Sequence, residues 1–428
     1  MPDLTSDFLP GLVSHRLPGL GLGEDFLYPN YGGHSILNLP DSLSRWLGAP
    51  ELGAGPLAKA LTEPLGDEFR HVVLVLMDAL SLHRLRRWIG DSSLPVWGSL
   101  AESGVLAPLT SITPCTTSAA LTTLWTGRGP AQHGIAGYEL WLKEYGLVAN
   151  SILHAPMSFK GEAGSLKAAG FEPEKFMTLR TLGLHLAQHG VQTFAFQHQG
   201  IANSGLSRML LHEVNGQAFH TPAELWANVR TTLESRTGGH KCYFWIYWGE
   251  VDHLSHFYGP DDARILGELI DFTAALKREF LDRLSPDARH ESLFILMADH
   301  GQIATQPDPH YDLRNHPGLA RRLHMLPTGE NRLAYLYVKP GQMEAVREYL
   351  ERTWPNQFIT LDPAYAVECG LFGPGDPHPR LLERLGDLLV IAKGQAYLWW
   401  STSEDHLYGR HGGLSPEEML VPFLAVRL

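Results

Sequence analysis

The 428-residue sequence has only three cysteines, Cys115, Cys242 and Cys369, and they lie far apart. Because they are odd in number and form no CxxC pair, they indicate neither a disulfide framework nor a thiolate zinc site. Isolated thiols of this kind fit the reducing conditions of the cytoplasm. We therefore expect a cytoplasmic protein.

Long apolar segments and an excess of positive charge are missing as well. No run approaches the roughly 20 apolar residues of a membrane span, and the N-terminus lacks the basic start and apolar core of a signal peptide. With 34 basic against 46 acidic residues, the formal net charge is −12. Stable nucleic-acid binding is not expected, because it needs a basic surface. We predict a non-exported protein, in which any anionic substrate would have to be drawn by a local feature such as metal ions.

What is present is the composition of an ordinary globular protein, with 44% hydrophobic and 19% charged residues and no internal repeat. Residues 1–66 are rich in glycine, proline and leucine and show weak periodicity. We interpret them as an ordered wrap or loop segment. The remainder, residues 67–428, is predicted to form the main domain.

Apolar runs followed by acids or turns dominate this remainder. The first, His71 to Met77, stops at Asp78, as a buried parallel strand does when it emerges at the carboxyl edge of a sheet. Further runs lie at residues 193–196, 243–248, 292–298, 388–392 and 421–426. Because helical segments separate the strands, we predict an α/β fold with a mostly parallel central sheet sandwiched by helices. Ligands of such sheets bind beyond the carboxyl ends of the strands.

Between His300 and about Gly386 this alternation loosens. A proline-rich loop is followed by a strand, NRLAYLYV, a helix, PGQMEAVREYL, and a short strand, FITL. This order predicts a small α+β insertion at about residues 305–386.

Acids and histidines gather at the predicted strand ends. Asp78, Asp252 and Asp299 each follow an apolar run, and His411 lies in a glycine-rich HGG loop. Each acid alone is explained equally well as a helix cap or turn residue. Asp252 and His256 are four residues apart, which places both on one face of a helical turn, as a metal-ligand pair requires. Their joint occurrence favours metal binding.

Asp299 and His300 are adjacent, so they converge only if the strand ends irregularly there. The candidate ligands are carboxylates and imidazoles without a thiolate. This set suits zinc, and manganese or iron tolerate it.

The segment SITPCTTSAALTTLWTGRGPAQHGI carries a candidate nucleophile. Residues Ser118 to Trp125 are predicted to form a helix, which places Thr117 at its start, near free backbone amides and the positive end of the helix dipole. The alternative is that Thr117 is only an N-cap. Thr116 competes for either role.

The order of these motifs, from Asp78 through TGRGPAQHGI, DHLSH and ADHG to the C-terminal HGG, resembles the alkaline phosphatase superfamily. Within it, the chain resembles the type I phosphodiesterase/nucleotide pyrophosphatase family, from about His71 to Leu428. The resemblance implies two divalent metal ions and a threonine nucleophile. By motif, one metal is held by Asp252, His256 and His411, and the other by Asp78, Asp299 and His300 together with the nucleophile Thr117.

Thr117 is preferred to Thr116 because it lies nine residues before Thr126, the family's usual interval. The implied activity is hydrolysis of phosphodiester or pyrophosphate bonds in a nucleotide or other small phosphate ester, through a phospho-threonine-type intermediate. His133 matches a position that we take to be structural. The family commonly has Asn three residues after the nucleophile, and Ala120 stands there instead, which leaves the substrate class open.

Other activities of the superfamily are alternatives. A sulfatase needs Pro and Arg shortly after its nucleophile, and Cys115 is followed by neither. A phosphomutase would need a large mobile cap after the nucleophile, and the segment between Ile135 and Cys242 looks too rich in strands and helices to form one. A phosphomonoesterase would need an Arg or Lys beside the phosphate, and Arg128 is expected to face away. A phosphonate hydrolase and a non-catalytic metal-binding module also stay open. Three further residues have two alternative roles, lining the site or packing in the protein interior. They are Asn203, Tyr138 and Trp141.

Overall fold

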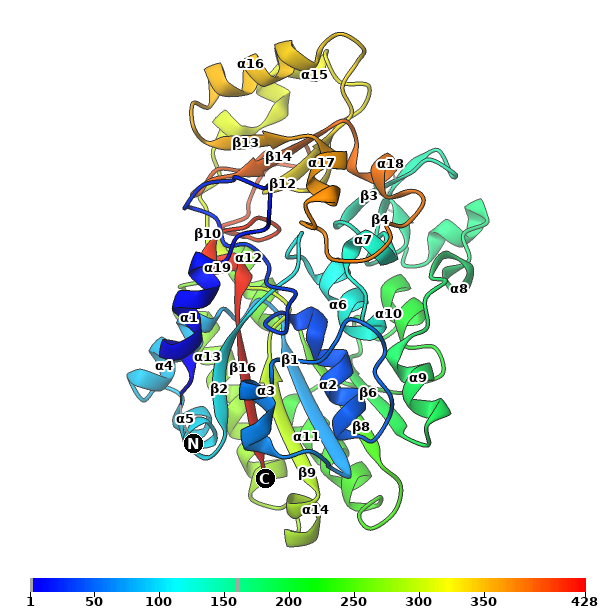
Figure 1. Ribbon diagram of the computed structural model, residues 1–428, viewed down its shortest axis with the longest axis vertical. Coiled ribbons are helices and arrows are strands. Elements are labelled where there is room, and N and C mark those ends of the chain that lie inside the picture. Colours follow the sequence, from blue (N-terminus) through cyan, green and yellow to red (C-terminus); the bar gives the residue numbers. More distant parts are fainter. Residues whose placement is uncertain (1–2, 159–161) are drawn as a thin grey trace.

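The computed structural model describes residues 3–158 and 162–428. A seven-stranded sheet in the order β2-β16-β9-β1-β8-β6-β7 forms its centre (Figure 1). Its strands are β1 (His71–Met77), β2 (Val105–Thr110), β6 (Gln192–His198), β7 (Asn215–Phe219), β8 (Cys242–Trp248), β9 (Ser292–Met297) and β16 (Leu420–Arg427). Every residue of β1, β8 and β9 is buried, as expected for central strands covered on both faces.

The central sheet is mostly parallel, which confirms the predicted fold class. β9, β1, β8, β6 and β7 pair in parallel, whereas β16 runs antiparallel to β2 on one side and to β9 on the other. The strand nearest the C-terminus is thus inserted inside the sheet rather than added at its edge.

Helices cover both faces of this sheet. Aromatic residues on β8 show the two layers, since Trp245 packs on Trp125 of α6 with ring centroids 5.3 Å apart, and Trp248 packs on Phe272 of α13 at 4.9 Å. The helices of this part are α4 (Leu82–Gly90), α5 (Pro95–Ser103), α6 (Thr117–Thr126), α7 (Pro130–His133), α8 (Pro173–Phe176), α9 (Leu182–Gln188), α10 (Gly205–Leu210), α11 (Pro222–Glu234), α12 (Glu250–Tyr258), α13 (Ala263–Ala275), α14 (Pro286–His290) and α19 (Pro416–Met419).

A second sheet, antiparallel throughout, lies above the first in Figure 1 in the order β13-β14-β12-β11-β3-β4-β5. Its strands are β3 (Glu139–Leu142), β4 (Leu147–Asn150), β5 (Ala155–Pro156), β11 (Thr328–Glu330), β12 (Leu333–Leu336), β13 (Phe358–Leu361) and β14 (Leu388–Ala392). The associated helices are α15 (Pro317–Ala320), α16 (Met343–Thr353), α17 (Pro363–Glu368) and α18 (Leu381–Leu385), and β10 (Ile303–Ala304) pairs with β15 (Gly409–Arg410).

The strands and helix predicted after His300 are present as β12, α16 and β13. One expectation was wrong: residues 388–392 were expected in the central sheet, but β14 pairs with β12 and β13 in the second sheet. All five of its residues are buried, so its apolar run looks the same as that of a central strand. The second sheet also recruits β3 to β5 from residues before the predicted insertion, and the division into domains stays a prediction.

The N-terminal segment packs against the main body, as residues 20–69 contribute to its hydrophobic core. It contains α1 (Thr5–Ser14), α2 (Leu39–Trp46) and α3 (Lys59–Thr62), with short 3₁₀ turns at Ile36–Asn38 and Glu63–Leu65. The buried carboxylate of Asp41 accepts hydrogen bonds from the backbone amides of Leu52, Gly53 and Gly55, which fixes the loop that follows α2. None of the described helices is both long and apolar enough to cross a membrane.

Candidate active site

Three acids converge at the carboxyl edge of the central sheet. Asp78 directly follows β1, Asp252 lies in the first turn of α12 after β8, and Asp299 comes two residues after β9. The strands are in matched register there, since Met77 pairs with Trp248 and Leu76 pairs with Met297. The register of these strands therefore brings the three acids together, as predicted from their positions at strand ends.

Asp252 sits between two histidines. Its Oδ2 lies 3.3 Å from Nε2 of His256, one turn along α12, and its Oδ1 lies 3.7 Å from Nε2 of His411. His256 donates its Nδ1 proton to the carbonyl of Gly409 at 2.8 Å, and His411 donates to the carbonyl of Cys115 at 3.2 Å. Because a carbonyl only accepts, Nδ1 carries a proton in both rings, and each Nε2 is directed into the cluster, where a metal ion would take the place of any proton on it, as in metal-ligating histidines.

The neighbouring group contains Asp78, Asp299 and His300. Nε2 of His300 lies 3.4 Å from Oδ1 of Asp78 and 3.6 Å from Oδ2 of Asp299, and its Nδ1 donates to the carbonyl of Gly301 at 3.0 Å. Both carboxylate oxygens are buried and accept no hydrogen bond from any described residue. The ring of His300 stacks on that of His411 with centroids 4.0 Å apart, so the two groups form one cluster.

Two sets of ligand atoms in this cluster are compact enough to hold a metal ion, each within 4.8 Å of one another. One set is Asp252, His256 and His411, which is also the first predicted triad. The other is Asp78, Asp252 and His300, so that Asp252 takes the place given to Asp299 in the predicted second triad. Asp299 stays adjacent and hydrogen-bonds the backbone amide of His300 at 3.0 Å.

The charges of the cluster also suit cations. Burial, followed by the negative charges of Asp299 and Asp252, raises the pKa of Asp78 well above its usual range, and burial raises the pKa of Asp299 to about 7. Burial opposes ionisation of Asp252 too, but the charge of His256 and its hydrogen bond hold the pKa of Asp252 below its usual range. Two buried oxygens without a donor beside three carboxylates fit a site in which divalent cations supply the missing charge.

Thr117 is the first residue of α6 and points at this cluster. Its hydroxyl donates to Oδ2 of Asp78 at 3.4 Å and lies 3.2 Å from Nε2 of His300. The first amide in the helical hydrogen-bond pattern is that of Ala120, bonded to the carbonyl of Thr116 at 2.9 Å. The amides of Thr117 to Ala119 therefore remain at the open end of the helix, beside the cluster.

Thr116, the alternative nucleophile, occupies the N-cap position of α6, with extended backbone angles. Its hydroxyl hydrogen-bonds the carboxyl group of Glu330 rather than the cluster. The HGG loop approaches the same glutamate closely. Gly412 has a φ of +105°, and a Cβ there would lie 2.5 Å from Cβ of Glu330, so this contact requires glycine.

A pocket of about 460 Å³ opens beside Thr117, Asp252, His256 and His411. Sequence reasoning missed most of its wall, which is built from two carboxyl groups and several aromatic rings. These are Glu139 and Glu330, with Tyr138, Phe257, Trp399 and Trp400. Tyr138 was the one wall residue that the sequence analysis named; the adjacent tryptophans were a further signal, but such a pair is more often part of a core.

The other sequence candidates are placed as follows. Tyr138 lines the pocket, whereas Asn203, Trp141 and Ala120 are not among its described lining residues, and Ala120 is fully buried within α6. His133 is buried and bonds the hydroxyl of Thr123 at 3.1 Å through Nε2. It joins α6 to α7, which agrees with the structural role expected for it.

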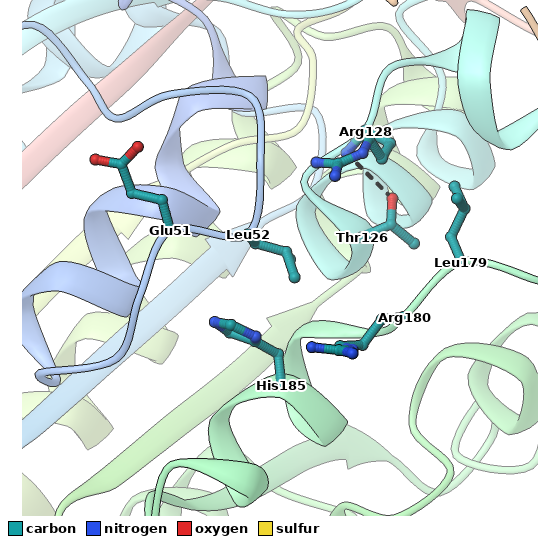
Figure 2. A pocket seen from close by; sticks show the side chains of 7 residues that line it. All are labelled: Glu51, Leu52, Thr126, Arg128, Leu179, Arg180 and His185. Carbon is teal, nitrogen blue, oxygen red and sulfur yellow. Dashed lines mark hydrogen bonds between the residues drawn. The ribbon is translucent and has the colours of Figure 1, made fainter. Parts of the chain in front are cut away.

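Arg128 lies in a separate pocket of about 310 Å³ at the far end of α6 (Figure 2). Glu51, Leu52, Thr126, Leu179, Arg180 and His185 also line that pocket. Figure 2 shows Arg128 beside Thr126, nine residues along the helix from Thr117. Arg128 thus faces away from the cluster, as expected, and does not supply the positive charge that a phosphomonoesterase site needs.

Solved structures with the same fold include murine ectonucleotide pyrophosphatase/phosphodiesterase 5, with a TM-score of 0.59, 17% identity, and coverage of 83% of this chain and 87% of that chain. An inactive form of the same murine protein in complex with AMP has a TM-score of 0.56 and 18% identity, and the match covers 83% of this chain and 87% of that chain. Phosphonoacetate hydrolase from Sinorhizobium meliloti, in complex with phosphonoformate, has a TM-score of 0.59 and 18% identity, and the match covers 83% of this chain and 90% of that chain.

No curated protein sequence matches the chain significantly. The family model "Type I phosphodiesterase / nucleotide pyrophosphatase" matches residues 72–414, which span the whole cluster from Asp78 to His411. With this match and an alkaline phosphatase-like fold, the chain belongs to the type I phosphodiesterase/nucleotide pyrophosphatase family of the alkaline phosphatase superfamily.

Proposed function

We propose that this protein hydrolyses phosphodiester or pyrophosphate bonds of small phosphate esters, with Thr117 as the nucleophile and two divalent metal ions. The observation that carries the proposal is the position of the Thr117 hydroxyl. It lies at the open end of α6, within 3.4 Å of both Asp78 and His300, and at the pocket wall. An N-cap role does not account for this position, because Thr116 is the N-cap residue.

The residues that would hold the metals are Asp252, His256 and His411 for one ion, and Asp78, Asp299 and His300 for the other. Asp252 also lies within ligand distance of Asp78 and His300. When bound, the ions would supply the positive charge that acidifies the Thr117 hydroxyl and neutralises phosphate oxygens, and zinc suits this ligand set, as would manganese or iron. Free amides at the start of α6 direct further positive potential toward a phosphate.

The reaction consists of two displacements. The Thr117 hydroxyl gives its proton to solvent and its Oγ1 attacks phosphorus, a phosphorus–threonine ester bond forms, and the bond to the leaving oxygen breaks. The leaving group takes up a proton. Water then attacks the phospho-threonine ester and releases Thr117, so that two inversions give net retention at phosphorus.

The pocket favours a diester over a monoester. No lysine or arginine is among the described residues that line it, whereas Glu139 and Glu330 are. A monoester dianion would bring a second negative charge to these carboxyl groups without a cationic side chain to offset it. The AMP complex of the murine relative supports a nucleotide-sized substrate.

The test compares bis-p-nitrophenyl phosphate with p-nitrophenyl phosphate on the zinc- or manganese-loaded protein. We expect diester cleavage to exceed monoester cleavage, and Thr117→Ala to lower kcat by about 10³-fold or more, because the variant lacks the oxygen that attacks phosphorus. The other hydroxyl at the cluster, that of Tyr247, is bonded to Asp78 and is not among the described residues that line the pocket. Thr116→Ala is the matched control and should still form a covalent phospho-peptide that contains Thr117. A full rate in Thr117→Ala would exclude this nucleophile, and failure to cleave either ester would contradict the proposed function.

A further inference from the structure

The pocket beside Thr117 is formed where the second sheet meets the cluster. Glu139 begins β3 and pairs with Gly329 of β11, so Glu330 follows directly on the neighbouring strand. Both glutamates line the same cavity as Thr117. Whatever organic group accompanies the reacting phosphate therefore meets two carboxyl groups.

Both carboxyl groups are held in place by neighbours. Glu330 is 8% exposed and accepts a hydrogen bond from the backbone amide of Tyr138 at 2.7 Å, in addition to its bond with Thr116. Oε2 of Glu139 accepts from the indole nitrogen of Trp400 at 3.0 Å, whereas no described residue donates to its Oε1. The carboxyl oxygens of the pocket are thus positioned but incompletely satisfied.

Aromatic rings form the rest of this wall. Trp399 and Trp400 are largely buried, Tyr138 is half-buried, and Phe257 is 47% exposed at the rim. The faces of such rings carry negative potential and attract cations. The described lining residues include no lysine or arginine, so neither of these cationic side chains would pair with an anionic group at this wall.

Burial of the two glutamates is consistent with a cationic ligand. Burial raises the pKa of Glu139 to about 7 and that of Glu330 to about 8, and the charge of Glu139 adds a smaller part of the rise for Glu330. A positive charge bound beside them would favour their ionised forms, whereas a negative charge would favour their protonated forms.

We propose that this pocket selects substrates whose organic group carries a positively charged nitrogen, bound between Glu139, Glu330 and the aromatic wall. The inference rests on the proposed function, because the organic group enters this pocket only if its phosphate reaches Thr117. It names a substrate class that the family match does not: phosphate esters of amino alcohols, in preference to neutral esters and to esters that carry a carboxylate.

Three p-nitrophenyl phosphodiesters that differ only in the second alcohol test this selectivity: the 2-aminoethyl, ethyl and carboxymethyl esters. We expect kcat/KM to fall in that order, with about tenfold between the first two, the size of a partly desolvated cation–aromatic contact. Glu139→Gln should reduce this amine-to-ethyl ratio. Glu344→Gln, on the exposed first turn of α16, is the matched control and should leave the ratio unchanged.

A binding measurement separates this inference from the proposed function. Calorimetric titration of 2-aminoethylphosphonate, ethylphosphonate and phosphonoacetate into metal-loaded Thr117→Ala requires no turnover. Tighter binding of the amine, weakened in Glu139→Gln or Glu330→Gln, supports the pocket assignment even if no ester is cleaved. Equal binding, tighter binding of phosphonoacetate, or an amine preference that survives both glutamate substitutions overturns it, whether or not the neutral ester is hydrolysed.

Discussion

At the scale of single residues, the candidate site depends on how its three histidine rings are oriented. His256, His300 and His411 each direct Nδ1 to a backbone carbonyl and Nε2 to a carboxylate. The carbonyl fixes both the tautomer and the ring plane, so the lone pair is aimed before any cation arrives. Asp252 is oriented comparably, because Gln302, fully buried, donates to its Oδ1 at 2.7 Å.

Removal of the Gln302 amide should therefore weaken metal binding. We expect Gln302→Leu to raise the dissociation constant for zinc by about 10–100-fold, as for other residues that orient a ligand without binding the metal. Competition with a chromophoric chelator measures this change. Gln217→Leu, in β7 and away from the cluster, is the control; an unchanged affinity in Gln302→Leu would show that Asp252 needs no such support.

Most residues of the candidate cluster were predictable from the sequence because they follow a strand or lie at helical spacing, whereas the ligand role of His411, in its HGG loop, came from the family resemblance. Glu139 and Glu330 were not, since nothing local marks them. They become neighbours through the pairing of β3 with β11, almost two hundred residues apart. Likewise, the apolar run of β14 indicated a strand but not its partner strands, because partner choice depends on topology rather than on periodicity.

At the scale of elements, a buried ion pair connects the second sheet to the loop that carries His411. Arg332, which precedes β12, bonds Glu418 of α19 at 2.7 and 2.9 Å, and both side chains are fully buried. Glu418 also accepts from the amide of Gly413 at 2.9 Å. One carboxylate thus fixes the HGG loop against the base of the second sheet.

Breaking this pair should be costly. We expect Arg332→Met to lower the free energy of unfolding by about 3–5 kcal/mol, because it leaves the Glu418 charge buried and unpaired. Urea denaturation measures the loss. The exposed pair Lys277–Asp282 is the comparison, since Lys277→Met should cost no more than about 1 kcal/mol. Similar losses in the two variants would contradict the importance given to burial.

At the scale of the whole molecule, the pocket glutamates couple stability to pH. The pKa of Glu330 in the folded protein is about 8, above its usual value. The folded state therefore binds this proton more tightly than the unfolded chain, so the stability associated with the proton is present at low pH and is lost as pH rises toward about 8.

Glu330→Gln, which stays neutral, should avoid that loss. We expect the metal-free variant and wild type to have similar stability near pH 5, and the variant to become more stable by an amount on the order of a few kcal/mol near pH 9. Thermal unfolding at a series of pH values, with Glu344→Gln as control, measures the difference. A difference that does not change with pH would mean that Glu330 is ionised without penalty in the folded protein.

The position of β16 inside the central sheet has a consequence for the order in which the fold is completed. Until residues 420–427 are available, β2 and β9 are not joined and each presents an open strand edge, which is a site for mispairing. His411 lies only nine residues before that strand. A chain from which residues 411–427 have not yet emerged therefore lacks both the closure of its main sheet and one ligand of the first candidate metal site, so tight metal binding and a closed sheet would be acquired together, once those residues are available.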